Sequence, residues 1–170
     1  MDTIFENTCI DSQEEYDQMF SWLMPKYGRV IGIISIVFGV VSILMAILLF
    51  EWLRVVAGIF LVFTGSYLLK FGSIKSKGLF KKKVETYDGV LPPKHYQFYE
   101  DRLRVFDVDS DTTMEYRRFK RIGFLKDCVA ILIDPADSVY LISNNGFTKG
   151  TFEEFERFLR EKCPNAKISD

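Results

Sequence analysis

Two long apolar runs dominate the pattern of hydrophobic and polar positions along the chain. Residues 30–50 contain no Asp, Glu, Lys or Arg over 21 positions, and residues 55–69 contain none over 15 more. An α-helix rises about 1.5 Å per residue, so the first run reaches roughly 31 Å, which matches a bilayer hydrocarbon core of about 30 Å. We therefore predict a transmembrane hairpin over residues 29–71, with helices at about 30–50 and 53–71.

The break between the two runs is the tetrapeptide Glu51-Trp52-Leu53-Arg54. A charge at the middle of a bilayer costs about 3 kcal/mol on insertion scales but little at the interface, where tryptophan is also enriched. We therefore predict that this segment is the tight turn of the hairpin, with Trp52 at the level of the lipid headgroups. Two alternatives are a buried helical hairpin in a soluble protein and one helix of about 60 Å through both charges. The length of the uncharged runs disfavours the first, and the two charges disfavour the second.

The residues before the hairpin predict a short lead, residues 1–28. We expect a short strand at Thr3–Phe5, and then a helix, because Ser12 and Glu15 have the spacing of a capping box. Apolar side chains follow at the helical spacing i, i+3, i+4, i+7 and i+8, namely Tyr16, Met19, Phe20, Leu23 and Met24. This face rests either on the membrane or on the globular part, and the acidic polar side of the helix disfavours lipid. A bend is expected at 25–28.

Beyond the hairpin the hydrophobic period becomes two, which predicts a β-rich domain over residues 84–163. The expected strands are residues 95–99, 102–105, 112–119, 128–133 and 138–142, with a turn at 134–137. A helix should follow, because Thr151 and Glu154 form a second capping box and Pro164 ends the pattern. Its apolar face contains Phe152, Phe155, Phe158 and Leu159.

The expected fold class is therefore an α+β membrane protein. It combines a two-helix transmembrane hairpin with a small antiparallel β domain capped by a C-terminal helix. Residues 72–83 form a basic juxtamembrane linker, and residues 164–170 form a tail.

Charge near the ends of the spans predicts their orientation. Six lysines lie between residues 70 and 83, namely Lys70, Lys75, Lys77, Lys81, Lys82 and Lys83. With Lys26 and Arg29 they place an excess of positive charge on one side, whereas the turn has only Arg54. Cytoplasmic loops carry such an excess, so both termini of this multi-pass protein are expected to be cytoplasmic, at a cell membrane. Lys75, Lys77, Lys81, Lys82, Lys83 and Trp52 are candidates for contact with the membrane surface. The simpler interpretation is that the lysines only determine topology.

Small residues recur along both predicted spans, at Gly32, Ser35, Gly39 and Ser42 in the first and at Gly58 and Gly65 in the second. Such stripes let helices approach closely in lipid, so we predict that the two spans pack through them. A pore or a homodimer interface is the functional alternative. No Asp, Glu, His or Asn lies within the spans, so nothing in them indicates a proton relay or ion transport.

Reactive or metal-binding chemistry has little support in the sequence. The chain has three dispersed cysteines and one histidine, so we predict neither a metal site nor a disulfide, and a reducing compartment. The alternating acids of Asp107–Asp111 lack the later glycine and glutamate of a calcium loop. A nucleophile pair of His95 and Cys128 is disfavoured because Cys128 begins an apolar strand. No nucleic-acid motif and no phosphate-binding loop is present, so the prediction includes no catalytic residue, no cofactor and no nucleic acid.

Several short motifs resemble the YcxB-like family of small bacterial membrane proteins. They are residues 96–103 (YQFYEDRL), 113–122 (TMEYRRFKRI), 139–142 (VYLI) with Phe147, and 151–159 (TFEEFERFL). The resemblance implies a C-terminal domain similar to bacterial pleckstrin-homology (PH)-like modules, a bent antiparallel sheet capped by a helix. In the family a Pro-Lys pair often precedes the phenylalanine near the last helix, whereas Asn145-Gly146 stands here. The family has no established catalytic residues, so no role is carried over.

These observations favour a membrane-anchored, non-enzymatic interaction or regulatory protein. Its cytoplasmic PH-like domain would bind a protein partner or lipid headgroups. The alternative is an oligomeric small channel or transporter accessory subunit built on the transmembrane hairpin. The expected partners are the lipid bilayer and a protein, with a homo-oligomer as an open alternative.

Overall fold

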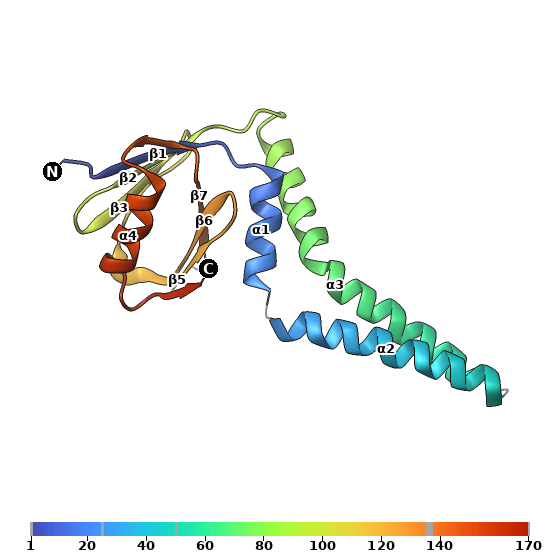
Figure 1. Ribbon diagram of the computed structural model, residues 1–170. Helices are drawn as coiled ribbons and strands as arrows, with labels where there is room; N and C mark the ends of the chain where they lie inside the picture. The colour runs from blue at the N-terminus through green and yellow to red at the C-terminus, as the bar shows by residue number, and fades with distance from the viewer. Residues whose placement is uncertain (1, 25, 50, 135–137, 170) are drawn as a thin grey trace. The chain divides into compact units, whose positions relative to one another are not determined.

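The chain forms two compact units in the computed structural model, which describes residues 2–24, 26–49, 51–134 and 138–169. Residues 20–79 make up one unit, here called the hairpin unit, and residues 1–19 with 80–170 make up the other, the β unit. The expected mixed α+β architecture with two long apolar helices is confirmed (Figure 1). Positions 25, 50 and 135–137, which include part of the expected bend and most of the expected turn, lie outside the described residues, and residues 26–28 already belong to a helix.

The hairpin unit is built from α2 (Lys26–Leu49) and the first part of α3 (Trp52–Thr86). Both helices are long and apolar enough to cross a membrane, by length and composition. α3 runs for 35 residues without a break, so the segment 72–83, expected to be a linker, is helical. The reason is local, since this segment has no proline and is rich in lysine, a good helix former.

The first sheet of the β unit contains the N-terminal strand. Its order is β4-β3-β2-β1-β8, and every pairing is antiparallel. The strands are β1 (Phe5–Cys9), β2 (Lys94–Phe98), β3 (Arg102–Phe106), β4 (Asp111–Glu115) and β8 (Phe147–Lys149). Because β1 lies between β2 and β8, the boundary expected between a lead of residues 1–28 and a domain of residues 84–163 does not describe the structure. All of α1 (Gln13–Leu23), α2 and α3 is inserted between two neighbouring strands of one sheet.

The second sheet has the order β7-β6-β5-β9. Its strands are β5 (Phe119–Phe124), β6 (Cys128–Ile133), β7 (Ser138–Ser143) and β9 (Lys167–Ser169), and β9 is parallel to β5. The single strand expected over 112–119 is wrong, because the chain turns through a 3₁₀ segment at Tyr116–Arg118 and changes sheet. The Tyr116 hydroxyl fixes this corner by sharing its one proton between the carbonyls of Tyr99, at 2.6 Å, and Arg102, at 2.9 Å.

The core lies between the two sheets and is capped by α4 (Phe152–Lys162). Aromatic rings dominate it, with Phe155 of α4 at 4.6 Å from Phe98 and 5.6 Å from Phe5, centroid to centroid. Such edge-on aromatic contacts each add about 1 kcal/mol beyond the area they bury. The predicted capping box at Thr151 and Glu154 is present at the start of α4 and fixes where the helix begins.

Helix α1 also begins at its predicted capping box. The Ser12 amide donates to Glu15 Oε2 at 3.0 Å, and the Glu15 amide donates to Ser12 Oγ at 3.2 Å. Within the β unit, Gln18 accepts from the Asp127 amide at 3.1 Å, just before β6, and its own amide donates to the Asp127 carboxylate. Glu15 and Met19 are buried. The first turns of α1 therefore rest on the globular part, one of the two surfaces expected for its apolar face (Figure 1).

Candidate functional site

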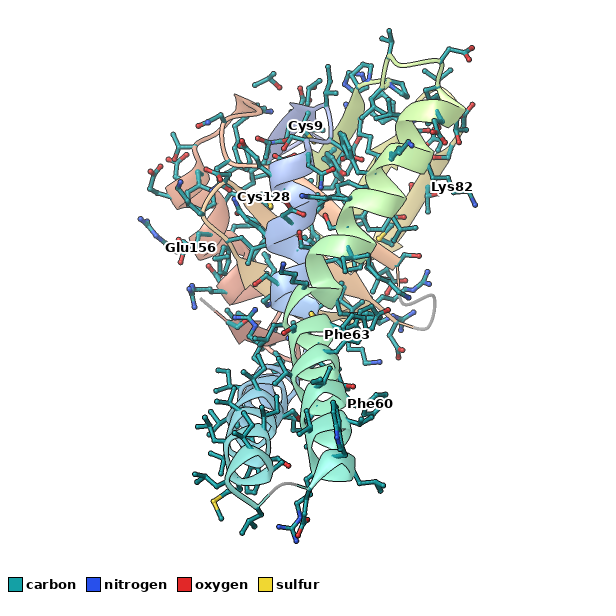
Figure 2. The ribbon with its side chains drawn as sticks, turned by 90° about the vertical axis from the view of Figure 1, so that its right-hand side faces the viewer. Cys9, Phe60, Phe63, Lys82, Cys128 and Glu156 are labelled. Carbon is teal, nitrogen blue, oxygen red and sulfur yellow. The ribbon has the colours of Figure 1, made fainter. Side chains whose placement is uncertain are left out.

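The lysines expected at a membrane surface fall into two groups. Lys75, Lys77, Lys81 and Lys82 are exposed on α3, and Figure 2 labels Lys82. Lys75 lies over the ring of Phe71, and Lys81 pairs with Glu85 at 3.7 Å. Lys83 differs from these four, because its side chain is 21% exposed and its ammonium group pairs with Asp11. Four of the five lysines thus remain available to a charged surface, and the fifth has an internal partner.

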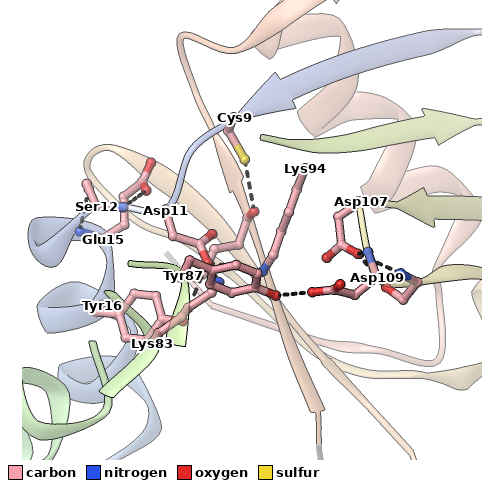
Figure 3. A network of polar contacts seen from close by, with 12 residues as sticks. Cys9, Asp11, Ser12, Glu15, Tyr16, Lys83, Tyr87, Lys94, Asp107 and Asp109 are labelled. Carbon is pink, nitrogen blue, oxygen red and sulfur yellow. Dashed lines mark hydrogen bonds and ion pairs between the residues drawn. The ribbon is translucent and has the colours of Figure 1, made fainter. Parts of the chain in front are cut away.

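Asp11 is the centre of a buried ion-pair cluster, which we define as Asp11, Tyr16, Lys83 and Lys94 (Figure 3). Its carboxylate side chain is 2% exposed and pairs with the ammonium groups of Lys83 and Lys94, the latter at 3.1 Å. Burial on its own would raise the pKa of Asp11, but the two lysines outweigh it, and the pKa lies below its ordinary value. Asp11 is therefore held as a carboxylate.

Tyr16 connects this cluster to two helices. Its hydroxyl donates to Asp11 Oδ2 over 3.5 Å, and its ring meets Phe80 edge-on at 5.4 Å. The Lys83 ammonium group lies 5.9 Å from the centre of the same ring. Burial and the nearby Asp11 carboxylate raise the pKa of Tyr16 to about 12, so the phenol stays neutral and donates.

The ion-pair cluster therefore joins the two places where the inserted helices connect to the β unit. Asp11 follows β1 and precedes α1, Lys83 lies in the last turn of α3, and Lys94 opens β2. A second tether lies close by, since the Tyr87 hydroxyl donates to Asp109 Oδ2 at 2.5 Å in the turn between β3 and β4 (Figure 3). This arrangement can fix the end of α3 against the sheet, and it contains no group poised for nucleophilic chemistry.

Sequence reasoning did not find Asp11, Tyr16 or Lys94 as members of one cluster. The available signal was weak: Asp11 is an acidic residue immediately before a predicted helix cap, between an apolar strand and an amphipathic helix. Its two lysine partners lie far away along the chain, and no local pattern predicts that they meet at one carboxylate.

The small residues of the hairpin unit lie where the two helices approach most closely. A Cβ atom built on Gly39 would lie 2.7 Å from the carbonyl oxygen of Gly58, and one built on Gly65 would lie 2.6 Å from that of Gly32. Real Cβ contacts are longer, so Gly39, Gly58 and Gly65 require glycine for the two backbones to touch, whereas a Cβ on Gly32 would meet the Leu69 side chain at 3.1 Å. Ser42 lies at the same interface and donates to the Arg54 carbonyl at 3.4 Å, and Ser35 is half-buried.

The two residues considered as a nucleophile pair lie in different sheets. His95, on β2, stacks on Phe106 at 4.9 Å, and its Nδ1 is 3.0 Å from the Thr8 hydroxyl. Cys128, on β6, is fully buried. Within the described residues no group of three or more His, Cys, Asp or Glu side chains is placed to hold a metal ion.

All three thiols should resist modification in the folded protein. Burial raises the pKa of Cys9 to about 11 and those of Cys128 and Cys163 to about 12, so the reactive thiolate is scarce at neutral pH. We expect less than one thiol per chain to react with a maleimide in mild detergent, and all three to react after denaturation. Mass spectrometry of the labelled protein checks this. Rapid labelling of any of the three in the native state contradicts the buried placement.

Comparisons with models of known protein families, with curated proteins and with solved structures gave no match to this chain. Its function is therefore inferred from its own residues.

Proposed function

We propose that this protein is a membrane-anchored, non-enzymatic interaction or regulatory protein. The hairpin unit anchors it, and the β unit binds a protein partner or lipid headgroups on the cytoplasmic side. The observation that carries the proposal is the apolar surface of α2 and α3. Large side chains there are mostly exposed, including Phe38 (67%), Leu48 (72%), Phe60 (68%) and Phe63 (72%) (Figure 2). A continuous apolar surface of this kind is stable in lipid and costly in water.

The ends of the two helices support the same proposal. α3 begins at Trp52, so most of the segment expected to be the turn is helical. Glu51 and Arg54 pair at 2.7 Å beside Trp52, which is 81% exposed, so the start of α3 offers the charges and the tryptophan of an interfacial segment. At the other end the exposed lysines of α3 follow the apolar part of the helix. Basic residues on this side favour cytoplasmic termini, and they would also attract anionic headgroups by about 1 kcal/mol each.

The proposed PH-like character of the β unit has support from its topology. Strands β1–β4 form one antiparallel meander, β5–β7 form another, and α4 follows and packs on the core between them. A small domain of this kind presents sheet faces, edges and turns to partners. The membrane hairpin would then enter as an insertion between its first and second strands.

Cysteine labelling in intact cells tests the topology. The native thiols are buried, so a single added cysteine reports its own position. We expect Leu53→Cys to react with a membrane-impermeant maleimide added outside, because Leu53 is exposed at the start of α3, which the proposal places on that side. Asp2→Cys and Lys82→Cys should react only after permeabilisation. Reaction of Asp2→Cys and Lys82→Cys from opposite sides, or recovery of the chain in the soluble fraction without detergent, overturns the proposed anchor.

The partner is tested by co-purification of the full chain in mild detergent at several salt concentrations. A defined protein recovered in constant ratio supports an interaction role. The alternative role, a channel or transporter accessory subunit, has less support, because the glycines expected at an oligomer interface already contact each other within one hairpin.

A further inference from the structure

Among the described strands, β4 is an open edge of the first sheet. It lies at the end of the order β4-β3-β2-β1-β8, and Asp111, Thr112, Thr113 and Glu115 are exposed. An edge strand presents unpaired backbone groups, and proteins usually blunt it with proline, lysine or a bulge. The sequence DTTME contains neither proline nor lysine, and its register with β3 is regular over all five residues.

The pairing with β3 shows which backbone groups point outward. The Asp107 backbone N–H donates to the Ser110 carbonyl at 2.9 Å and closes the turn as a hydrogen-bonded pair. The next such pairs are therefore Val105 with Thr112 and Leu103 with Met114. The N–H and C=O groups of Asp111 and Thr113 and the N–H group of Glu115 therefore point away from β3, whereas the Glu115 carbonyl begins the 3₁₀ segment at Tyr116–Arg118. An extended segment could pair with these three residues without disturbing the sheet.

The side chains of β4 on the outer face of the sheet indicate which charge an added strand should have. Asp111 and Glu115 lie on the outer face of the sheet, on either side of Thr113, and pair with Arg104 at 2.5 Å and Arg117 at 2.6 Å. Both pairs are exposed, so each contributes little and can be shared with an incoming base. Next to Thr113 the outer face is hollowed into a shallow cleft of about 390 Å³, lined also by Tyr99, Arg102 and Arg104.

A second copy of this chain is disfavoured at the edge. Antiparallel self-pairing centred on Thr113 would set Asp111 opposite Glu115 twice, and like charges directly opposite destabilise a sheet. A strand with basic residues at those two positions would instead set opposite charges across from Asp111 and Glu115, which stabilises the pairing. Its intervening side chains would lie on the inner side, beside Thr112 and Met114, where β-branched residues fit.

We propose that β4 is a docking edge for an extended segment of a partner protein. The segment has Lys or Arg at its first and fifth positions and β-branched residues at the second and fourth. It adds a strand to β4, pairs through the outward groups of Asp111, Thr113 and Glu115, and places its bases against the two carboxylates. This inference rests on the proposed interaction role, and it names the surface and the chemistry of the partner.

Fluorescence anisotropy with the full chain in mild detergent tests the proposal. The probe is a labelled peptide with the core Lys-Val-Thr-Val-Lys, and the control peptide has Glu in place of both lysines. We expect the basic peptide to bind about tenfold more tightly or better, and the double variant Asp111→Lys/Glu115→Lys to reverse the preference. Equal binding of the two peptides, or no binding of either, overturns the proposal.

Backbone pairing is tested at Thr113, where proline removes only an outward N–H. Thr113→Pro should lower the affinity for the basic peptide about tenfold. Thr113→Val keeps the N–H and should bind the peptide as tightly as the wild type does. Unchanged hydrogen exchange in β3 shows that each variant is folded. Binding that survives Thr113→Pro in a folded protein overturns strand addition. If the peptide does not bind as expected but the cysteine labelling shows the pattern of an anchored protein, only the docking edge is rejected. If the cysteine labelling gives a different pattern, the membrane anchor is rejected.

Discussion

Asp11→Asn is expected to lower the free energy of unfolding of the β unit by about 3 kcal/mol. Removing one partner of a buried ion pair leaves the remaining charge without compensation, which costs about 3–5 kcal/mol. The lower end of this range of destabilisation applies because the side chains of Lys83 and Lys94 are each 21% exposed and can turn toward water. Urea unfolding in mild detergent, followed by hydrogen exchange of β1 and β2, measures the change.

Matched variants separate the ion-pair cluster from a general effect of charge. Glu14→Gln removes an exposed carboxylate from α1 and should change stability by less than about 0.5 kcal/mol. Lys83→Met should destabilise the β unit, whereas Lys82→Met, one residue earlier on the same helix, should not. Equal effects of Lys82→Met and Lys83→Met would show that the contact with Asp11 has no energetic weight.

The pH dependence provides an independent measurement of the same contact. The folded pKa of Asp11 lies below the ordinary value of 3.8, so its ionised form contributes stability above that pH. This contribution is lost as the pH falls through the lower, folded pKa. The stability difference between the wild type and Asp11→Asn should therefore be constant near neutral pH and shrink below about pH 4. A difference that stays constant down to pH 3 contradicts the ion pair.

Features encoded by neighbouring residues could be predicted from the sequence. The capping boxes at Ser12 and Thr151 depend on contacts three residues apart, and both are present. The apolar run of Cys128–Ile133 matches β6 to the residue, and two uninterrupted apolar runs gave two long helices. In each of these the deciding interactions lie within one helical turn or one strand.

Features that depend on distant partners could not be predicted in the same way. The strand expected at Thr3–Phe5 lies at Phe5–Cys9 instead, where β1 pairs with β2 and β8. The three-residue strands β8 and β9 have no pattern of their own. The corner at Tyr116 exists because its hydroxyl reaches carbonyls from an earlier hairpin. These segments acquire their conformation from tertiary pairing, which outweighs weak local preferences.

Lys83 shows a signal that was present in the sequence but not used. The buried positions of α3 are Gly58, Gly65, Gly72 and Ser76, spaced by seven, seven and four residues, so they lie on one face of the helix. Lys83 lies seven residues after Ser76 and therefore on that face, unlike Lys82 and the other exposed lysines. Helical periodicity, applied to the basic segment as well as to the apolar one, separates the lysine with an internal partner from the rest.

Gly39→Ala is expected to loosen the packing of α2 against α3 by about 1–3 kcal/mol, the usual cost of an overpacked contact. The added methyl would meet Val62 Cγ2 and the Gly58 carbonyl, both at 2.7 Å, and the Val62 amide nitrogen at 2.9 Å. Two of these atoms belong to the backbone, so the helices must separate rather than adjust a side chain. Amide hydrogen exchange of the full chain in detergent should become faster in both helices around the contact.

Gly78→Ala is the matched control, since no described atom lies within 4 Å of the added carbon. Alanine is a better helix former than glycine by about 1 kcal/mol, so this variant should exchange as slowly as the wild type or more slowly. Light scattering of Gly39→Ala distinguishes the remaining alternative. If the variant changes its oligomeric mass while the exchange within α2 and α3 stays unchanged, the glycines join chains to one another rather than the two helices of one hairpin.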